Sequence, residues 1–224
     1  GYTMERMRFA NPISVKLGFK AIEAHLTDLG RPLDCFCACE LRSPAPFDDK
    51  GFIAFNRIYV GTLERWGIFK GDENPVARSN VCPEIRPPAE PSFHAFSYTV
   101  PVTDKEERPS FVISGSAEAT EGPGDYGERT IWLGETTPDA MREKARYVLG
   151  AMETRMSALG LGWSDVSATQ VYTIHDLHSY LADEIVSRGA AVNGLTWYYA
   201  RPPVNTLDYE MDVRGVPVER VLAV

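Results

Sequence analysis

An internal repeat constrains the fold of this 224-residue chain more than any other feature of its sequence. Ala21 to Gly30 and Met152 to Gly160 each predict an amphipathic helix that ends on Leu-Gly, where glycine supplies the left-handed C-terminal residue. A strand follows each helix, beginning at Asp34 in one copy and at Asp165 in the other. The sequence therefore predicts two related units of strands and helices.

The second halves of the two units also correspond. Each contains a further helix, a Pro-Val pair and two closing strands. In the first unit these are 52–69, 75–76, 79–85 and 92–100, and in the second they are 177–188, 203–204, 206–213 and 217–224. We predict an α+β fold in which each unit covers one face of its mixed sheet with two helices and packs the open face against the other unit.

The second unit is complete, whereas the first lacks its opening hairpin. The strand Phe111-Val112-Ile113-Ser114-Gly115 opens the second unit, and a Gly-rich hairpin loop leads to an expected strand at 129–133. The segment 2–16 is too short for such a hairpin, and Asn11-Pro12 predicts a turn within it.

The best candidate for a linker is the segment 101–109, which is charged and has no apolar periodicity. We therefore predict an incomplete unit over 1–101 and a complete unit over 109–224.

Composition disfavours several kinds of partner. The net charge is −8, from 23 Lys and Arg against 31 Asp and Glu, and nucleic-acid binding requires clustered cations that the sequence lacks. No apolar run approaches the length of about 18 residues that a membrane span requires, and no signal-peptide pattern opens the sequence. We expect a cytoplasmic protein without a nucleic-acid or membrane partner.

Two groups of residues raise the question of a metal. Cys35, Cys37 and Cys39 alternate along a strand, a spacing that suits core packing better than zinc, which usually takes Cys-x-x-Cys from a turn. His175 and His178 stand at a helical spacing of three, but no third ligand accompanies them. We expect no metal site.

Arginines beside loops are the candidates for binding an acid. Arg78 stands where the turn 71–75 leads into a strand, and from there its guanidinium offers a bidentate fork to a carboxylate. A surface arginine without a ligand is the alternative. Arg201 follows the aromatic stretch 197–199, which either lines a pocket or belongs to the core.

The order and spacing of several short motifs resemble the RidA family. They are Phe-Val-Ile-Ser-Gly at 111–115, the helix that ends in Leu-Gly, Trp163-Ser164-Asp165-Val166, Pro75-Val76-Ala77-Arg78-Ser79 and Val218-Glu219-Arg220-Val221. The second unit covers the whole length of that family, and the first covers most of it. The resemblance implies chorismate-mutase-like units, a homotrimer with pockets between units, and hydrolysis of enamines and imines to ketoacids and ammonia.

The resemblance also implies roles for particular residues. The family's arginine, which grips the substrate carboxylate, matches Arg78, and its glutamate, which serves the attacking water, matches Glu219. At the corresponding places the first unit has His94 and the second has Asn205 or Thr206. The catalytic pair is therefore divided between the two units. Either a cleft between the packed units combines the two residues, or each pocket is a half-site that does something other than imine hydrolysis.

Three further residues complete the expected site. Backbone N–H groups near Ser114 and Gly115 are expected to orient the substrate, and Arg201 is a second candidate for the carboxylate anchor. An imine is already electrophilic, so this chemistry requires no cofactor. The expected ligand is a small carboxylate-bearing molecule.

Two alternatives from other classes stay open. The chorismatases are more distantly similar as fused pairs of such units, which implies an enzyme acting on a cyclic carboxylic acid. A non-catalytic protein that binds small acids is the other alternative. Whether Arg78 and Glu219 point into one cleft discriminates most strongly between the readings.

Overall fold

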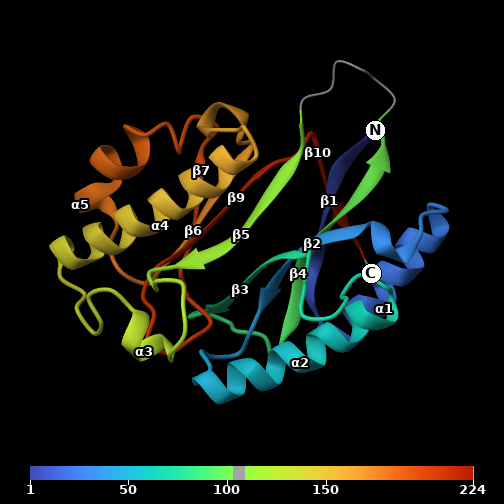
Figure 1. Cartoon of the computed structure of the whole chain (residues 1–224), viewed down its shortest axis with the longest axis horizontal. Helices are drawn as coiled ribbons and strands as arrows, with labels where there is room; N and C mark the ends of the chain where they lie inside the picture. The colour runs from blue at the N-terminus through green and yellow to red at the C-terminus, as the bar shows by residue number, and fades with distance from the viewer. Residues whose placement is uncertain (103–108, 224) are drawn as a thin grey trace.

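Two mixed β-sheets lie face to face with helices on their outer sides in the computed structural model, which describes residues 1–102 and 109–223 (Figure 1). Helices α1 (Val15–Asp28) and α2 (Asp49–Arg65) cover one outer side, and α4 (Pro138–Ala158) and α5 (His178–Tyr180) cover the other. An α+β protein with two mixed sheets is thereby confirmed. The expected linker lies largely outside the described residues, so the domain boundaries stay a prediction.

The first sheet draws strands from both halves of the chain. Its members are β1 (Tyr2–Ser14), β2 (Phe36–Arg42), β3 (Ala77–Pro83), β4 (Ser92–Pro101), β8 (Ala200–Arg201) and β10 (Val218–Leu222). Their spatial order is β10-β1-β4-β2-β3-β8. Because β8 pairs with the end of β3 and β10 pairs in parallel with β1, the second half of the chain closes both edges of this sheet.

The second sheet is formed by the second half alone. Its order is β5 (Phe111–Ala117), β9 (Glu210–Gly215), β6 (Ala168–Tyr172) and β7 (Leu195–Tyr198). Helix α4 begins at a cap, where the Thr137 hydroxyl accepts the N–H of Ala140 at 3.3 Å. Its buried stripe consists of Met141, Ala145, Val148, Leu149, Met152 and Met156. These side chains form the core against β5 and β9.

The N-terminal segment differs from the expectation of a short piece broken by a turn. Residues 2–14 form one long strand, β1, whose ladder with β4 shifts register between Arg8 and Ile13. Proline cannot donate a ladder hydrogen bond, so the strand accommodates Asn11-Pro12 as a bulge. A single strand thus takes the place of the opening hairpin that the first unit lacks.

Three elements of the second unit also differ from expectation. The strand expected at 129–133 is wrong: α3 (Tyr126–Arg129) is one helical turn, and Trp132 behind it has a positive φ of 51°, which a strand does not accommodate. The closing strand β10 pairs with β1 rather than with β9, because β1 offers an open edge. The expected helix 177–188 consists of short α5 and a π-helical turn at Leu181–Val186.

Strand β9 has two chemically different faces. Tyr209, just before the strand, and Met211 and Val213 within it are fully buried in the core beneath α4. The alternate residues are buried on the opposite face, which meets the first sheet: Glu210, Asp212 and Arg214. A strand that buries charge on one face and apolar side chains on the other serves both a core and a polar interface.

A charge cluster fills the space between the sheets, and we define it as Arg6, Glu40, Arg42, His94, Asp212 and Arg214. At its centre, Glu40 lies 2.6 Å from Arg6 Nε and 3.9 Å from Arg214 Nη1. Burial alone would raise the pKa of Glu40, but Arg6, Arg214 and Arg42 together hold it well below its ordinary value. The open faces of the two sheets therefore meet through paired charges.

Two of the three expected core cysteines lie in the core. Cys35 and Cys39 are buried beneath α1 and α2, whereas Cys37 is half-buried and lies outside that core cluster. Burial raises the pKa of the Cys37 and Cys39 thiols to about 12. Within 1–102 and 109–223, no group of three or more His, Cys, Asp or Glu is placed to hold a metal ion. None of the described helices is long and apolar enough to span a membrane.

Candidate active site

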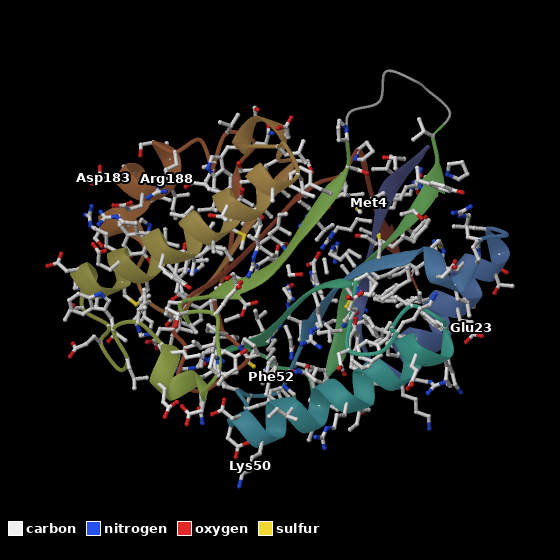
Figure 2. All side chains as sticks on the ribbon, in the orientation of Figure 1. Met4, Glu23, Lys50, Phe52, Asp183 and Arg188 are labelled. Atoms are coloured by element: carbon white, nitrogen blue, oxygen red, sulfur yellow. The ribbon has the colours of Figure 1, made fainter. Side chains whose placement is uncertain are left out.

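A cleft between the two units forms a cavity of about 280 Å³. Strands β3, β5 and β9 supply its floor, and α2, α3 and α4 supply its walls. Figure 2 shows Phe52 at the end of α2 that faces α3, where its ring lies 6.2 Å from that of Tyr126. The charged residues of the lining are Arg78, Glu121, Arg129, Arg155 and Glu210. The cavity is close to the lower end of the size range of small-molecule sites.

Arg78 enters this cleft from β3 and is held by aromatic rings. Its guanidinium carbon lies 5.0 Å from the ring centre of Tyr59 and 5.7 Å from that of Phe52. Its backbone N–H donates to the hydroxyl of Ser114 at 3.3 Å, which ties β3 to β5. Among the described residues Arg78 forms no ion pair, so its N–H donors face the cavity uncommitted to a carboxylate.

Glu210 enters the same cleft from the first position of β9. Its side chain is buried, and burial raises its pKa well above the ordinary value, with the charge of Asp212 adding to the rise. Arg78 and Arg42 oppose the rise without cancelling it. Burial therefore favours the protonated form of Glu210, the form that can donate a proton to a ligand.

Gly115 makes room for this acid. A Cβ at position 115 would clash with Oε1 of Glu210 and would lie 3.2 Å from the Cβ of Ser79. Glycine therefore lets β5 pass close to the carboxyl group without displacing it. Ser114 beside it accepts from Arg78 through its hydroxyl and from Arg155 through its carbonyl oxygen. The structure thus brings Arg78, Ser114 and Gly115 together, as the sequence predicts.

Glu219 is not among them. It lies on β10, where it accepts hydrogen bonds from Arg214 Nε at 2.7 Å and from Arg6 Nη1 at 3.0 Å. It does not line the cleft that holds Arg78. The reason is the pairing of β10 with β1, which carries the end of the chain to the far edge of the first sheet.

Three other expected site residues also lie elsewhere. Arg201 pairs with Glu84 at 2.8 Å on the outer end of the first sheet. His94 belongs to the charge cluster, where burial and the charge of Arg42 lower its pKa to about 3. Asn205 is exposed, and its backbone N–H donates to the carbonyl of Phe47. Not one of these side chains lines the cleft.

The carboxyl group that the sequence analysis missed is Glu210. Its signal was present: Tyr209 to Arg214 reads Tyr-Glu-Met-Asp-Val-Arg, a strict alternation of apolar and charged residues. An exposed outer face explains such a pattern as well as a buried one does. Only the packing of a second sheet against that face turns Glu210 into a buried acid.

Comparison with known proteins identifies the chain. The family model of the 2-aminomuconate deaminase CnbZ matches residues 1–220. This chain belongs to the CnbZ family. A member of known activity, the 2-amino-5-chloromuconate deaminase of Comamonas testosteroni, is 50% identical over 222 residues, which cover 99% of this chain and 88% of that protein.

Solved structures extend the comparison to the fold. A chorismatase matches with a TM-score of 0.52 and 12% identity, covering 96% of this CnbZ-family chain and 75% of that one. A cyanuric acid hydrolase matches with a TM-score of 0.47 and 10% identity over 97% of this chain and 69% of the other. The likeness to chorismatase shows a shared fold, as the sequence analysis expects.

Family membership also confirms the predicted kind of activity. The chain is a hydrolase, a deaminase that acts on a small carboxylate-bearing enamine. Family membership favours this activity over the two alternatives, an enzyme that acts on a cyclic carboxylic acid and a non-catalytic protein that binds small acids.

Proposed function

We propose that the cleft hydrolyses 2-aminomuconate, or a close analogue such as its 5-chloro derivative, to the corresponding 2-oxo acid and ammonia. The observation that carries the proposal is a buried carboxyl group, Glu210, in the same cleft as Arg78. An enamine becomes hydrolysable when a carbon of its double bond is protonated, and that step requires a carboxylic acid with a raised pKa. Burial raises the pKa of Glu210 in the required direction.

The reaction follows from these two side chains. Arg78 binds the carboxylate next to the carbon that bears nitrogen. Glu210 gives its proton to C3 of the enamine, which leaves an iminium at C2 and an ionised Glu210. Water then adds to C2, and Glu210 takes the proton that the water loses.

Collapse of the resulting carbinolamine completes the cycle. Glu210 protonates the nitrogen, ammonia leaves, and the hydroxyl proton returns to Glu210 as the C=O bond forms. One water is consumed and one ammonia is released, and Glu210 ends protonated as it began. Because the ionised intermediate state of Glu210 is buried, the guanidinium of Arg78 stabilises it.

Two carboxamide variants test the assignment. Glu210→Gln keeps the size of the side chain but removes the transferable proton, so kcat for ammonia release from 2-aminomuconate should fall by roughly two to four orders of magnitude. The Glu219 side chain forms its ion pairs outside the cleft, so kcat of Glu219→Gln should stay within about threefold of wild type. Loss of the diene absorbance gives a second readout of turnover.

A larger loss of kcat in Glu219→Gln than in Glu210→Gln would assign the catalytic role to Glu219. If wild type shows only the uncatalysed rate while a carboxylate still binds, the chain is a binding protein. The homotrimer that the resemblance to the RidA family implies is part of this proposal, and light scattering on the purified chain tests it.

A further inference from the structure

The cleft carries cations at two places, one beside Glu210 and one at the loop that follows β5. Resting on the proposed function, we propose that Arg129 and Arg155 bind the second carboxylate of the substrate and thereby select dicarboxylates over monocarboxylates. Arg78 binds the first carboxylate, beside the reacting carbon. The site thus contacts both carboxylates of the substrate, one at each end of its carbon chain.

Arg129 is held in place by its own loop. Its Nε donates to the carbonyl of Gly124 at 3.2 Å, and its Nη1 donates to the carbonyl of Thr120 at 2.8 Å. The guanidinium lies 4.6 Å above the ring of Tyr126, which is itself part of the cavity lining. A guanidinium has five N–H donors, so Nη2 is left for a ligand while the group stays oriented.

Arg155 reaches the same region from α4. Its Nη1 donates to the carbonyl of Ser114 at 3.3 Å, and its Nη2 lies 3.3 Å from a carboxylate oxygen of Glu121. The side chain of Glu121 is 89% exposed, so this pair is weak and easily exchanged. A substrate carboxylate that replaces Glu121 meets an arginine already anchored to β5.

The charge of the lining suits a dianion. Three arginines outnumber the two carboxyl groups of the cleft. The exposed Glu121 releases Arg155 when a substrate carboxylate takes its place, so the two carboxylates of the substrate face three arginines. Beside the polar Asn80, Ser116 and Thr120, the lining also includes apolar side chains, which suit a hydrocarbon chain: Phe52, Ala117, Ala119, Ala151, Pro203 and Leu207.

A matched pair of unreactive ligands tests the inference without turnover. The trans,trans isomers of muconate and sorbate are six-carbon dienes of the same geometry, and only muconate has a second carboxylate. By calorimetry or competition, wild type should bind muconate about ten- to a hundredfold more tightly than sorbate. Because binding is measured directly, the result stands or falls separately from deamination.

Variants then assign the preference to residues. Arg129→Met and Arg155→Met should each weaken muconate by about tenfold and leave sorbate within about twofold. Arg142→Met is the control, because Arg142 lies on the same helix as Arg155 but pairs with Asp183 outside the cleft. A loss of affinity for sorbate in any variant would indicate general damage to the site.

A gain of affinity provides a test that misfolding cannot imitate. Glu121→Gln removes the carboxylate that competes for Arg155, so muconate should bind about two- to threefold more tightly, with sorbate unchanged. Equal losses of muconate and sorbate in the arginine variants would overturn the inference. An unchanged ratio of the two affinities in both arginine variants would overturn it as well.

Discussion

The charge cluster and the cleft share strand β9, yet the pKa values of Glu40 in the cluster and Glu210 in the cleft are shifted in opposite directions. Glu40 in the cluster is surrounded by Arg6, Arg42 and Arg214, and its pKa is held low. Glu210, four residues before Arg214 on β9, is buried without such a set of partners, and its pKa is raised. Burial acts on both, and the number of arginines decides the outcome.

The difference separates structure from function. A buried charge with several partners joins the two sheets and has no capacity left for a ligand. A buried acid without an ion-pair partner is poorly solvated, which favours its protonated form and so its capacity to transfer a proton. Burial of Glu210 is therefore expected to lower the stability of the fold while making this carboxyl group reactive, whereas Glu40 should contribute to stability alone.

The largest effect that tests this comparison is on folding. Glu40→Gln leaves the surrounding arginines buried without their carboxylate, so the free energy of unfolding should fall by about 3–5 kcal/mol. Glu210→Gln removes a buried carboxyl group whose ionisation is disfavoured and keeps its size, so the free energy of unfolding should stay equal or rise by up to about 1 kcal/mol. Urea denaturation at pH 7 measures both. Equal losses in the two variants would contradict the assigned states.

The pH dependence of the same measurement has opposite signs for the two groups. Since the pKa of Glu40 is lower in the folded state, its contribution to stability is present above the ordinary value of 4.5 and is lost as the pH falls toward the folded value. Since the pKa of Glu210 is raised, its contribution is present below 4.5 and is lost as the pH rises. The advantage of Glu210→Gln should therefore grow as the pH rises above 4.5.

An intermediate effect is expected on ligand binding. Arg78→Met removes the cation that meets the first carboxylate, so sorbate and muconate should both bind about ten- to a hundredfold more weakly. Arg201→Met is the comparison, because Arg201 forms a half-exposed pair with Glu84 and should matter by less than about twofold. Isothermal calorimetry distinguishes the two. A larger loss in the Arg201 variant would make Arg201 the anchor.

Much of the fold was predictable because local signals agree with it. The Leu-Gly helix ends, the Thr137 cap and the buried Met stripe of α4 each specify an element from nearby residues alone. The partner of strand β10 was not predictable, because pairing with β9 or with β1 depends on which of these strands has an open edge in three dimensions. The bulge at Asn11-Pro12 likewise depends on β4 beside it.

The site was predictable only in part for a related reason. Arg78 and Gly115 were nominated by the resemblance, and both line one cleft. Glu219 follows the family's motif but is carried to another edge by β10. The role of Glu210 depends on burial between two sheets, which is a property of the packing and is not encoded in the spacing of one strand.

The smallest effect concerns the glycine that makes room for the acid. Gly115→Ala places a Cβ against Oε1 of Glu210, so the carboxyl group must shift, and kcat should fall by about tenfold with little change in ligand affinity. Gly150→Ala in α4 is the matched control, because its Cβ would meet nothing within 4 Å and should stabilise the helix by up to about 1 kcal/mol. Steady-state kinetics and thermal melts on both variants separate displacement of Glu210 from general damage. Proton transfer from Glu210 depends on the position of its carboxyl group, so displacing that group must lower kcat. An unchanged kcat in Gly115→Ala would therefore mean that the proton does not come from Glu210 in this position.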